Sequence, residues 1–239
     1  MTKPVTLFEL AAADPEVRFS PHCWKARYAL AHKGLQAERV PWRFTDKDAI
    51  AFTGQGLVPV LLHGDEVLTD SWRIATFLEA HYPDRAPLFG GDAEPIAEFV
   101  NAWADTALLP RIARIILVDI HANIAEADKS YFRQTREKRF GASLEEISSD
   151  QPALIKDLQA TLAPLRGLLK SRPFLAGAEP RYADYSVLGM FIWARCIGGA
   201  ELLQPDDPVH QWRERLLDLF DGLGRNAPRA APSQVAKQA

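Results

Sequence analysis

The sequence has few cysteines and no long apolar run. Its 239 residues include two cysteines, Cys23 and Cys196, which lie far apart in the chain. This number and spacing argue against a disulfide framework and against a cysteine zinc site, and a reducing cytoplasm is the expected location. No apolar segment approaches the roughly 20 residues of a membrane span. The first ten residues are typical of a strand rather than of a signal peptide.

Charge and glycine patterns exclude further classes of protein. The formal net charge of −3 gives no reason to expect binding to nucleic acid or to an anionic membrane. The chain has no glycine-rich phosphate loop, so a nucleotide-type cofactor is not expected. The spacing of His22, Cys23 and His32 does not bring the three side chains to one helical face, so no metal site is predicted.

The first third of the chain alternates between strand and helix patterns. Strands are predicted at 5–10 and 36–42, a hairpin at 58–68 around His63-Gly64-Asp65, helices at 21–34 and 70–82, and a weaker helix near 46–52. This order predicts a small α/β sheet domain over residues 1–82.

The rest of the chain is predicted to be helical. Residues 83–92 have the proline and glycine content of a linker, and 93–226 are expected to form an all-α domain. The expected helices there include a long one with a break near Pro110, one at 152–171, an almost uniformly apolar and therefore buried one at 183–197, and one starting at 209. The tail at 227–239 is predicted to be disordered.

The stretch Ser20-Pro21-His22-Cys23 has the form of a thioredoxin-type C-x-x-C motif with serine in place of the first cysteine. In one interpretation Ser20 only caps the helix, since Pro21 suits the first helical position. In the other, its hydroxyl donates a hydrogen bond to an anion at the positive helix end. Cys23 falls on the core face and is predicted to be a buried thiol rather than a nucleophile. His22 is a weaker candidate for a base.

Two further segments allow a structural and a functional interpretation. Pro59 opens a predicted strand, either as a plain trans proline or with a cis Val58–Pro59 bond that turns the backbone of Val58 outward. Thr69, Asp70 and Ser71 mark the start of a helix, where free N–H groups favour a carboxylate and Asp70 can pair with a ligand ammonium. Ordinary capping is the alternative for the second segment.

These three features, followed by an all-α domain, resemble the glutathione transferases over about residues 5–226. The resemblance implies a thioredoxin-like N-terminal domain that binds glutathione as cosubstrate. It also implies the five residues of the glutathione site, namely Ser20, Val58, Pro59, Asp70 and Ser71. Ser20 would hydrogen-bond the glutathione sulfur, Val58 would pair with the cysteinyl backbone, and the last two would hold the γ-glutamyl end. Ser20 is then the catalytic residue, as a donor to the thiolate and not as a nucleophile.

Several segments are similar to a narrower group, the glutathione-dependent β-etherases of lignin-degrading bacteria and related fungal transferases. The similar segments are "SPHCWKARYALAHKG", "DSWRIATFLEAHYPDRAPLF", "TREKRFGASLE", "YADYSVLGMFIWA" and "LFDGLGR". This similarity implies attack of the thiolate on a carbon that bears an aryloxy group next to a ketone, with release of a phenol. One departure concerns Arg181, which stands where transferases usually place Ser or Thr; Asp184 is still expected to cap the buried helix.

The electrophile is expected in an apolar pocket between the domains. The candidate residues combine a helical stripe with two aromatic side chains of the first helix: Trp24, Tyr28, Trp103, Ile112 and Ile116. Core packing is the alternative for each of them. The implied partners are glutathione, a hydrophobic aromatic electrophile and a second copy of the chain in a homodimer.

Three other functions stay open at this point. One is a detoxifying glutathione transferase that acts on another electrophile. The second is a transferase-like fold that serves as a binding or interaction module with little catalysis. The third is a thiol–disulfide oxidoreductase, which the serine at position 20 disfavours.

Overall fold

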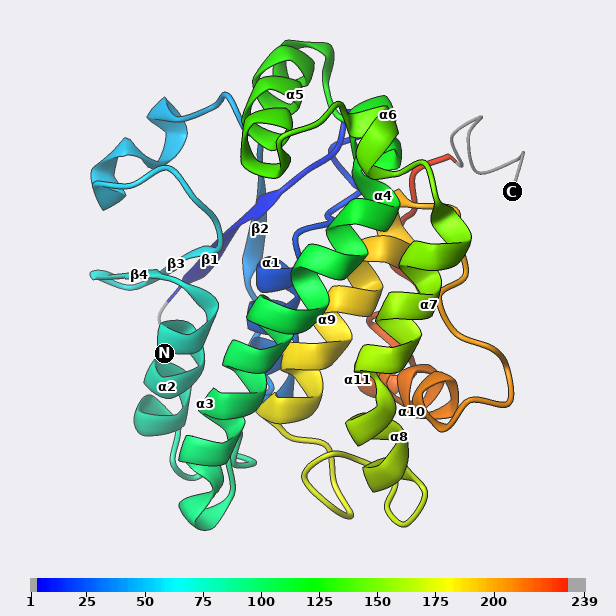
Figure 1. Ribbon diagram of the computed structural model, residues 1–239. Coiled ribbons are helices and arrows are strands. Elements are labelled where there is room, and N and C mark those ends of the chain that lie inside the picture. Colours follow the sequence, from blue (N-terminus) through cyan, green and yellow to red (C-terminus); the bar gives the residue numbers. More distant parts are fainter. Residues whose placement is uncertain (1–3, 232–239) are drawn as a thin grey trace.

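A computed structural model describes residues 4–231, which form a sheet domain followed by a helical domain (Figure 1). The N-terminal part contains four strands with helices α1(Pro21–His32) and α2(Ser71–His81), and the described residues after α2 contain no further strand. The predicted α/β domain followed by an all-α domain is therefore confirmed. None of the described helices is both long and apolar enough to cross a bilayer.

The sheet is mixed, with strand order β2-β1-β3-β4. Strand β1 pairs in parallel with β2 and antiparallel with β3, and β3 pairs antiparallel with β4. The bounds are β1(Val5–Leu10), β2(Glu38–Trp42), β3(Val60–His63) and β4(Glu66–Thr69). The predicted hairpin is present, and Gly64 supplies the positive φ of 61° that its two-residue turn requires.

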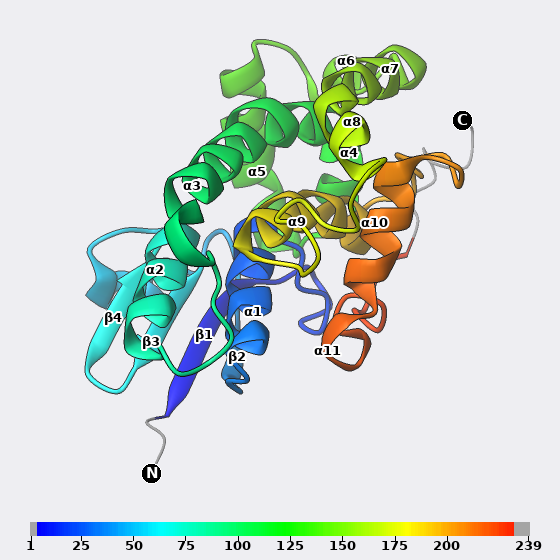
Figure 2. The same cartoon turned by 90° about the horizontal axis from the view of Figure 1, so that it is seen from below.

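Helices α1 and α2 lie side by side against the sheet, and the later helices pack beyond α1 (Figure 2). The helices of the second domain are α3(Glu94–Trp103), α4(Leu109–Asn123), α5(Glu126–Phe140), α6(Leu144–Ile147), α7(Gln151–Thr161), α8(Ala163–Leu169), α9(Tyr182–Ile197), α10(Pro208–Leu217) and α11(Leu219–Gly222). The weak helix expected near 46–52 is a 3-10 segment, η1(Asp48–Thr53), and a second one is η2(Gly91–Ala93).

Helix breaks occur close to prolines. The long helix predicted after residue 93 is interrupted by a π-helical turn, η3(Ala104–Leu108), and Pro110 lies in the first turn of α4, where its missing N–H costs no hydrogen bond. The single helix predicted at 152–171 is two helices. The reason is Pro164, which has no N–H to donate to the carbonyl of Ala160.

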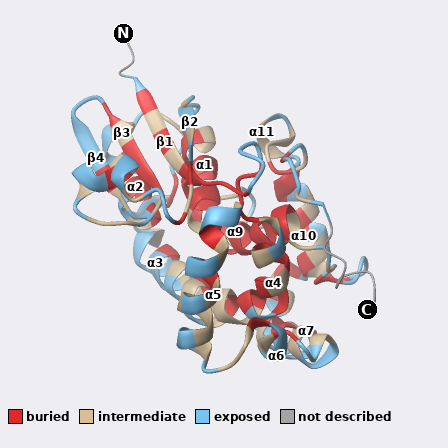
Figure 3. Cartoon of the chain, turned by 90° about the horizontal axis from the view of Figure 1, so that it is seen from above, coloured by how far each residue is buried: buried red, intermediate tan, exposed pale blue. Residues whose placement is uncertain are grey.

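Helix α9 forms the centre of the second domain, as predicted. All of its residues except Arg195 are buried, and its visible part in Figure 3 is largely red. Asp184 fixes its start. One carboxylate oxygen accepts hydrogen bonds from the N–H of Leu175 (2.7 Å) and from Trp212 Nε1 (2.8 Å), and the other accepts from the N–H of Arg181 (3.0 Å). The carboxylate thus caps α9 although arginine occupies the usual Ser/Thr position.

Helices α1 and α9 cross in close contact, which joins the two domains. A methyl group on Gly189 would lie 2.6 Å from the carbonyl oxygen of Pro21, so the backbones approach as closely as glycine permits. Next to the crossing, the fully buried ammonium of Lys25 bonds to Asp105 Oδ1 (2.6 Å) and to Asn101 Oδ1 (2.8 Å). These contacts fix the first turn of α1 against the helical domain.

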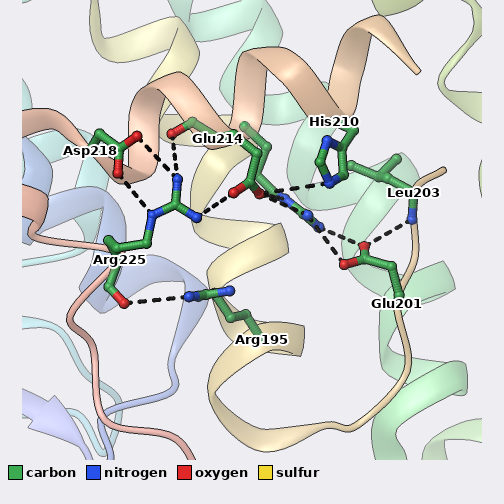
Figure 4. A network of polar contacts seen from close by, with 8 residues as sticks. Arg195, Glu201, Leu203, His210, Glu214, Asp218 and Arg225 are labelled. Atoms are coloured by element: carbon green, nitrogen blue, oxygen red, sulfur yellow. Dashed lines mark hydrogen bonds and ion pairs between the residues drawn. The ribbon is translucent and has the colours of Figure 1, made fainter. Parts of the chain in front are cut away.

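A network of ion pairs holds the C-terminal helices (Figure 4). The guanidinium of Arg225 pairs with Asp218 (2.8 Å) and with Glu214, and the side chain of Arg195 donates to the carbonyl of Arg225 (3.3 Å). Because several charges share these partners, the segment after α11 is tied to α9 and α10 more firmly than an isolated surface pair would allow.

The tail is ordered further than expected. Ala227 is buried and the N–H of Ala230 donates to the carbonyl of Cys196 (2.7 Å), so the prediction of disorder from 227 is wrong for residues 227–231. The backbone hydrogen bond to the end of α9 and the buried methyl group explain the difference. The rest of the predicted tail, 232–239, lies outside the described residues.

We expect Gly189→Ala to lower the free energy of unfolding by about 1–3 kcal/mol, because the new methyl group overpacks the crossing of α1 and α9. The matched control is Gly167→Ala in α8, where an added Cβ meets nothing within 4 Å. That change should raise stability by about 0.5–1 kcal/mol through helix propensity. Urea denaturation measures both; equal stability changes would contradict the close crossing.

Candidate functional site

Ser20 is the N-cap of α1 and lies at the junction of the two domains. Its backbone is extended (φ −64°, ψ 127°), its Oγ accepts a hydrogen bond from the N–H of Cys23 (3.3 Å), and Pro21 follows in the first turn. The side chain is almost buried but lines a cavity. A hydroxyl that accepts the capping bond still has its own hydrogen to donate, so capping and binding of an anion are compatible roles.

The Val58–Pro59 peptide bond is cis, and it precedes strand β3. Within residues 4–231, the N–H and C=O of Val58 have no hydrogen-bond partner. Both residues line a cleft of about 390 Å³, whose other lining residues are His22, Gln55, Leu57, Thr69 and Asp70. The free backbone groups of Val58 are thus available to an extended peptide-like ligand.

Asp70 starts helix α2 from an unusual backbone conformation. Its φ of 85° lies in the region that favours glycine, and its Oδ1 accepts from the N–H groups of Trp72 (2.9 Å) and Arg73 (3.1 Å). Strained residues of this kind concentrate at binding sites. Ser71 is buried, and its carbonyl accepts from the Tyr182 hydroxyl (2.9 Å), which anchors the start of α2 to α9.

A second cavity of about 300 Å³ adjoins the cleft and shares His22, Leu57 and Val58 with it. It lies between the sheet domain and helices α4, α5 and α9. Its remaining lining residues are mainly apolar and aromatic: Leu10, Phe19, Ser20, Pro21, Trp42, Phe44, Lys47, Leu109, Ala113, Leu117, Ile120, Tyr131, Phe132, Arg136, Arg139, Phe140 and Trp193. Ser20 therefore lies where an apolar cavity meets the cleft that holds the free backbone groups of Val58.

The five residues expected to bind the electrophile do not line this cavity. Four of them, Trp24, Tyr28, Ile112 and Ile116, are core residues, and Trp103 is partly buried and packs against the core. Trp24 Nε1 donates to the carbonyl of Arg18 and the Tyr28 hydroxyl to that of Leu216. The residues that line the cavity therefore replace these five as candidates for contact with the electrophile. Core packing therefore describes these five residues, whereas a neighbouring stripe of α4, formed by Leu109, Ala113, Leu117 and Ile120, faces the cavity.

The residues that the sequence prediction missed come from the loop after β2 and from α5. The aromatic and basic side chains of α5 that line the cavity are Tyr131, Phe132, Arg136, Arg139 and Phe140. The signal was present, because positions 132, 136, 139 and 140 fall at i, i+4, i+7 and i+8 on one helical face. The prediction of the pocket did not use this amphipathic, charged segment.

The titratable groups beside Ser20 are neutral. Burial, with help from Glu9, raises the pKa of Cys23 to about 12, so the sulfur stays a thiol at neutral pH. Burial and the neighbouring Lys25 lower the pKa of His22 to about 4, against the pull of Asp105, whose Oδ1 lies 3.7 Å from the His22 Nδ1. Neither group offers a thiolate or an imidazolium to a bound ligand.

Residues 15–86 match the N-terminal domain family of glutathione S-transferases, and residues 96–218 match the C-terminal domain family. The chain belongs to the glutathione transferase family.

The chain is 28% identical over 185 residues to the glutathione S-transferase-like protein ustS of Aspergillus flavus; the match covers 69% of this chain and 62% of that relative. The aligned region thus spans less than two thirds of the relative's length. The crystal structure of glutathione transferase GSTFuA3 from Phanerochaete chrysosporium is similar, with 26% identity, a TM-score of 0.75 and 93% coverage of each chain. The fold also matches the glutathione S-transferase CsGST83044 of Ceriporiopsis subvermispora, at 22% identity and a TM-score of 0.80, over 92% of this chain and 99% of that one.

We expect neither cysteine of the native protein to react with a thiol reagent such as Ellman's reagent at pH 8, because Cys23 and Cys196 are both buried and burial raises both pKa values to about 12. In guanidinium chloride both should react at once. Absorbance of the released thiolate measures the number of labelled groups. Rapid labelling of one cysteine in the native state would contradict the assignment of Cys23 as a core thiol.

Proposed function

We propose that the protein is a glutathione transferase in which Ser20 stabilises the glutathione thiolate at the N-terminus of α1, for attack on an aromatic electrophile in the apolar cavity. The observation that carries the proposal is the position of the Ser20 hydroxyl. It caps a helix at the point where a cleft with free backbone groups meets an apolar cavity.

The chemistry of the cleft fits glutathione. The N–H and C=O of Val58, which have no partner within residues 4–231, suit the backbone of the cysteinyl residue. The exposed carboxylate of Asp70 suits the γ-glutamyl ammonium, and the N–H of Ser71 at the start of α2 suits its carboxylate. The related CsGST83044 structure is described as a complex with glutathione, which supports this cosubstrate.

The energetics of one hydroxyl are sufficient for the proposed role. A free thiol has a pKa of about 8.5, so only a few per cent is thiolate at neutral pH. A hydrogen bond to the charged form contributes about 1.5–3 kcal/mol, and the helix N-terminus adds about 0.3–1 kcal/mol. At about 1.36 kcal/mol per unit, these effects lower the thiol pKa by about one to three units. Thiolate then becomes the main species at pH 8 over this whole range, and at pH 7 when the pKa falls by more than about 1.5 units.

For the reaction we propose β-ether cleavage. The thiolate attacks the carbon that bears the aryloxy group next to a ketone, the C–S bond forms as the C–O bond breaks, and the phenolate leaves and takes a proton from water. The apolar, aromatic lining of the cavity supports an aryl substrate. The similarity of several sequence segments to β-etherases supports an aryl ether as the substrate. A detoxifying transferase with another aromatic electrophile is the alternative for the same site.

Two other functions are less well supported by the site. A thiol–disulfide oxidoreductase needs a reactive thiolate, whereas the raised pKa of Cys23 keeps that sulfur protonated. An interaction module without catalysis needs no hydroxyl between a cleft and a cavity. The chain has this arrangement, which favours catalysis.

We also propose a homodimer in the cytoplasm. Four of the described large apolar side chains are more than half exposed, and such surface groups are typical of protein interfaces: Phe52 in η1, Leu57 before β3, and Ile96 and Phe99 in α3. The two cysteines are free thiols, as expected for a protein kept in a reducing compartment.

We expect Ser20→Ala to raise the pKa of bound glutathione by about one to two units and to lower kcat/KM at pH 7 about 10- to 100-fold, because the hydrogen bond to the thiolate is lost. Thiolate absorbance near 240 nm, titrated against pH, measures the pKa.

Loss of the N-cap is a separate effect of this change, and it costs about 0.5–2 kcal/mol of stability. Ser20→Asp separates the two effects, since aspartate caps equally well but has no hydroxyl to donate. In both variants the pKa of bound glutathione should rise, and only Ser20→Ala should have a lower free energy of unfolding. An unchanged pKa in both would assign thiolate stabilisation to backbone N–H groups.

The function as a whole is tested by release of a phenol from an α-keto β-aryl ether. We expect release that requires both the enzyme and glutathione, with one glutathione thioether formed for each phenol, measured by chromatography. Glutathione binding in calorimetry without phenol release would be consistent with a glutathione transferase but would contradict the proposed β-etherase activity. The absence of both would point to the interaction module.

A further inference from the structure

The apolar cavity of about 300 Å³, in which we place the electrophile, carries positive charge on one side. Lys47, Arg136 and Arg139 are among its lining residues, and within residues 4–231 no aspartate or glutamate lines it. None of the three cations has an ion-pair partner in the described part of the chain. Other arginines of the second domain, such as Arg133 and Arg213, are paired with carboxylates at 2.7–2.8 Å. Arg114 and Arg215 also lack an ion-pair partner within the described residues, so what distinguishes these three cations is that they line one cavity that no described carboxylate lines.

Arg136 lies among aromatic rings. Its guanidinium carbon is 4.7 Å from the ring centre of Phe132 and 5.1 Å from that of Phe44, and its Nη1 donates to Thr135 Oγ1 (2.8 Å). Burial and the nearby Arg139 lower its pKa, but a guanidinium remains charged at every physiological pH. A partly buried charge without a counter-ion is unfavourable, so a bound anion would relieve a cost that the empty cavity carries.

Lys47 adds charge from the opposite domain. Its ammonium donates to the carbonyl of Gly56 (2.6 Å) and lies 4.7 Å and 5.4 Å from the ring centres of Trp42 and Tyr131. The acidic group that influences it, Asp128, raises its pKa, but burial and Arg136 lower it more. The oxygens of Asp128 accept from the backbone N–H groups of Phe44 and Thr45 and from the Thr45 hydroxyl, and Asp128 does not line the cavity.

We infer that the aromatic electrophile carries an anionic group, and that Arg136 and Arg139 of helix α5 bind that group. The inference rests on the proposed transferase function of the same site. A guanidinium pairs with a carboxylate through two parallel hydrogen bonds, while the aromatic and aliphatic walls accommodate the rest of the molecule. The carboxylates of glutathione are a poorer match, because neither arginine lines the cleft that contains Val58 and Asp70.

The test compares two aryl ethers that differ in one group: the phenacyl ether of 4-hydroxybenzoate and the corresponding carboxamide. Calorimetry without glutathione measures binding of each. We expect the wild-type protein to bind the carboxylate at least about tenfold more tightly than the amide, as charge-assisted hydrogen bonds imply. Arg136→Gln and Arg139→Gln should each reduce this preference, and the double variant should abolish it.

The matched control is Lys138→Gln. Lys138 is exposed on the same helix and does not line the cavity, and its substitution removes the same unit charge. The preference for the carboxylate over the amide should therefore persist in this variant. Equal affinity of the wild-type protein for the two ethers, or no binding of the carboxylate, would overturn the inference. A loss of the preference in Lys138→Gln would also overturn it, because the preference would then come from the overall positive charge of helix α5 and not from a binding site in the cavity.

Kinetics separate this inference from the proposed function. If the arginines serve glutathione instead, the double variant raises the KM for glutathione and leaves the ratio of kcat/KM for the two ethers unchanged; that result would overturn the inference. If the proposed function fails, neither ether releases a phenol, and the calorimetric preference for the carboxylate still decides whether Arg136 and Arg139 bind an anion.

Discussion

Helix α1 is packed between the sheet and helix α9, and the position of every group in the candidate site depends on that packing. Gly189 allows the backbone of α9 to approach the carbonyl of Pro21, one residue from Ser20. The partly buried ion pair of Lys25 with Asp105 lies beside this crossing and holds α1 to the helical domain. Such a pair adds little stability once the desolvation of both charges is subtracted, but it defines one arrangement of the two domains. The cavity for the electrophile exists only between domains that are held in this way.

The position of the sulfur follows from the same packing. Because α1 turns Cys23 into the core, burial keeps its thiol protonated, and the helix N-terminus is left for an external ligand. The hydroxyl of Ser20 both accepts the capping bond and keeps a hydrogen to donate. A serine thus retains the helix-end geometry of a thioredoxin-type motif, and in the proposed mechanism the cosubstrate supplies the nucleophile. The neutral state of His22 fits this division, since a thiolate that is already formed needs no base.

Local sequence patterns predicted the features that depend on neighbours along the chain. The hairpin around Gly64, the capping serine and aspartate at positions 20 and 70, and the apolar helix at 183–197 were all visible as short motifs. The cavity lining depends on contacts between distant segments. An apolar stripe looks the same whether it faces a core or a pocket, so Ile112 and Ile116 were assigned to the substrate although they pack internally. Phe132 and Arg136 were overlooked because only the packing of α5 over the loop after β2 turns that face inward.

The division of the site between two domains has a kinetic consequence. In the proposed mechanism, thiolate stabilisation by Ser20 acts on the reacting atom, whereas Arg136 and Arg139 contact a group that has the same charge before and during the reaction. Interactions that are equal in the ground state and in the transition state lower KM and leave kcat unchanged. Selection of the electrophile by α5 can therefore change without any change in the chemistry at α1. The free energy of a guanidinium that is partly buried without a counter-ion is recovered only by an anionic substrate, so the same charges also disfavour neutral aromatic molecules that would merely fill the cavity.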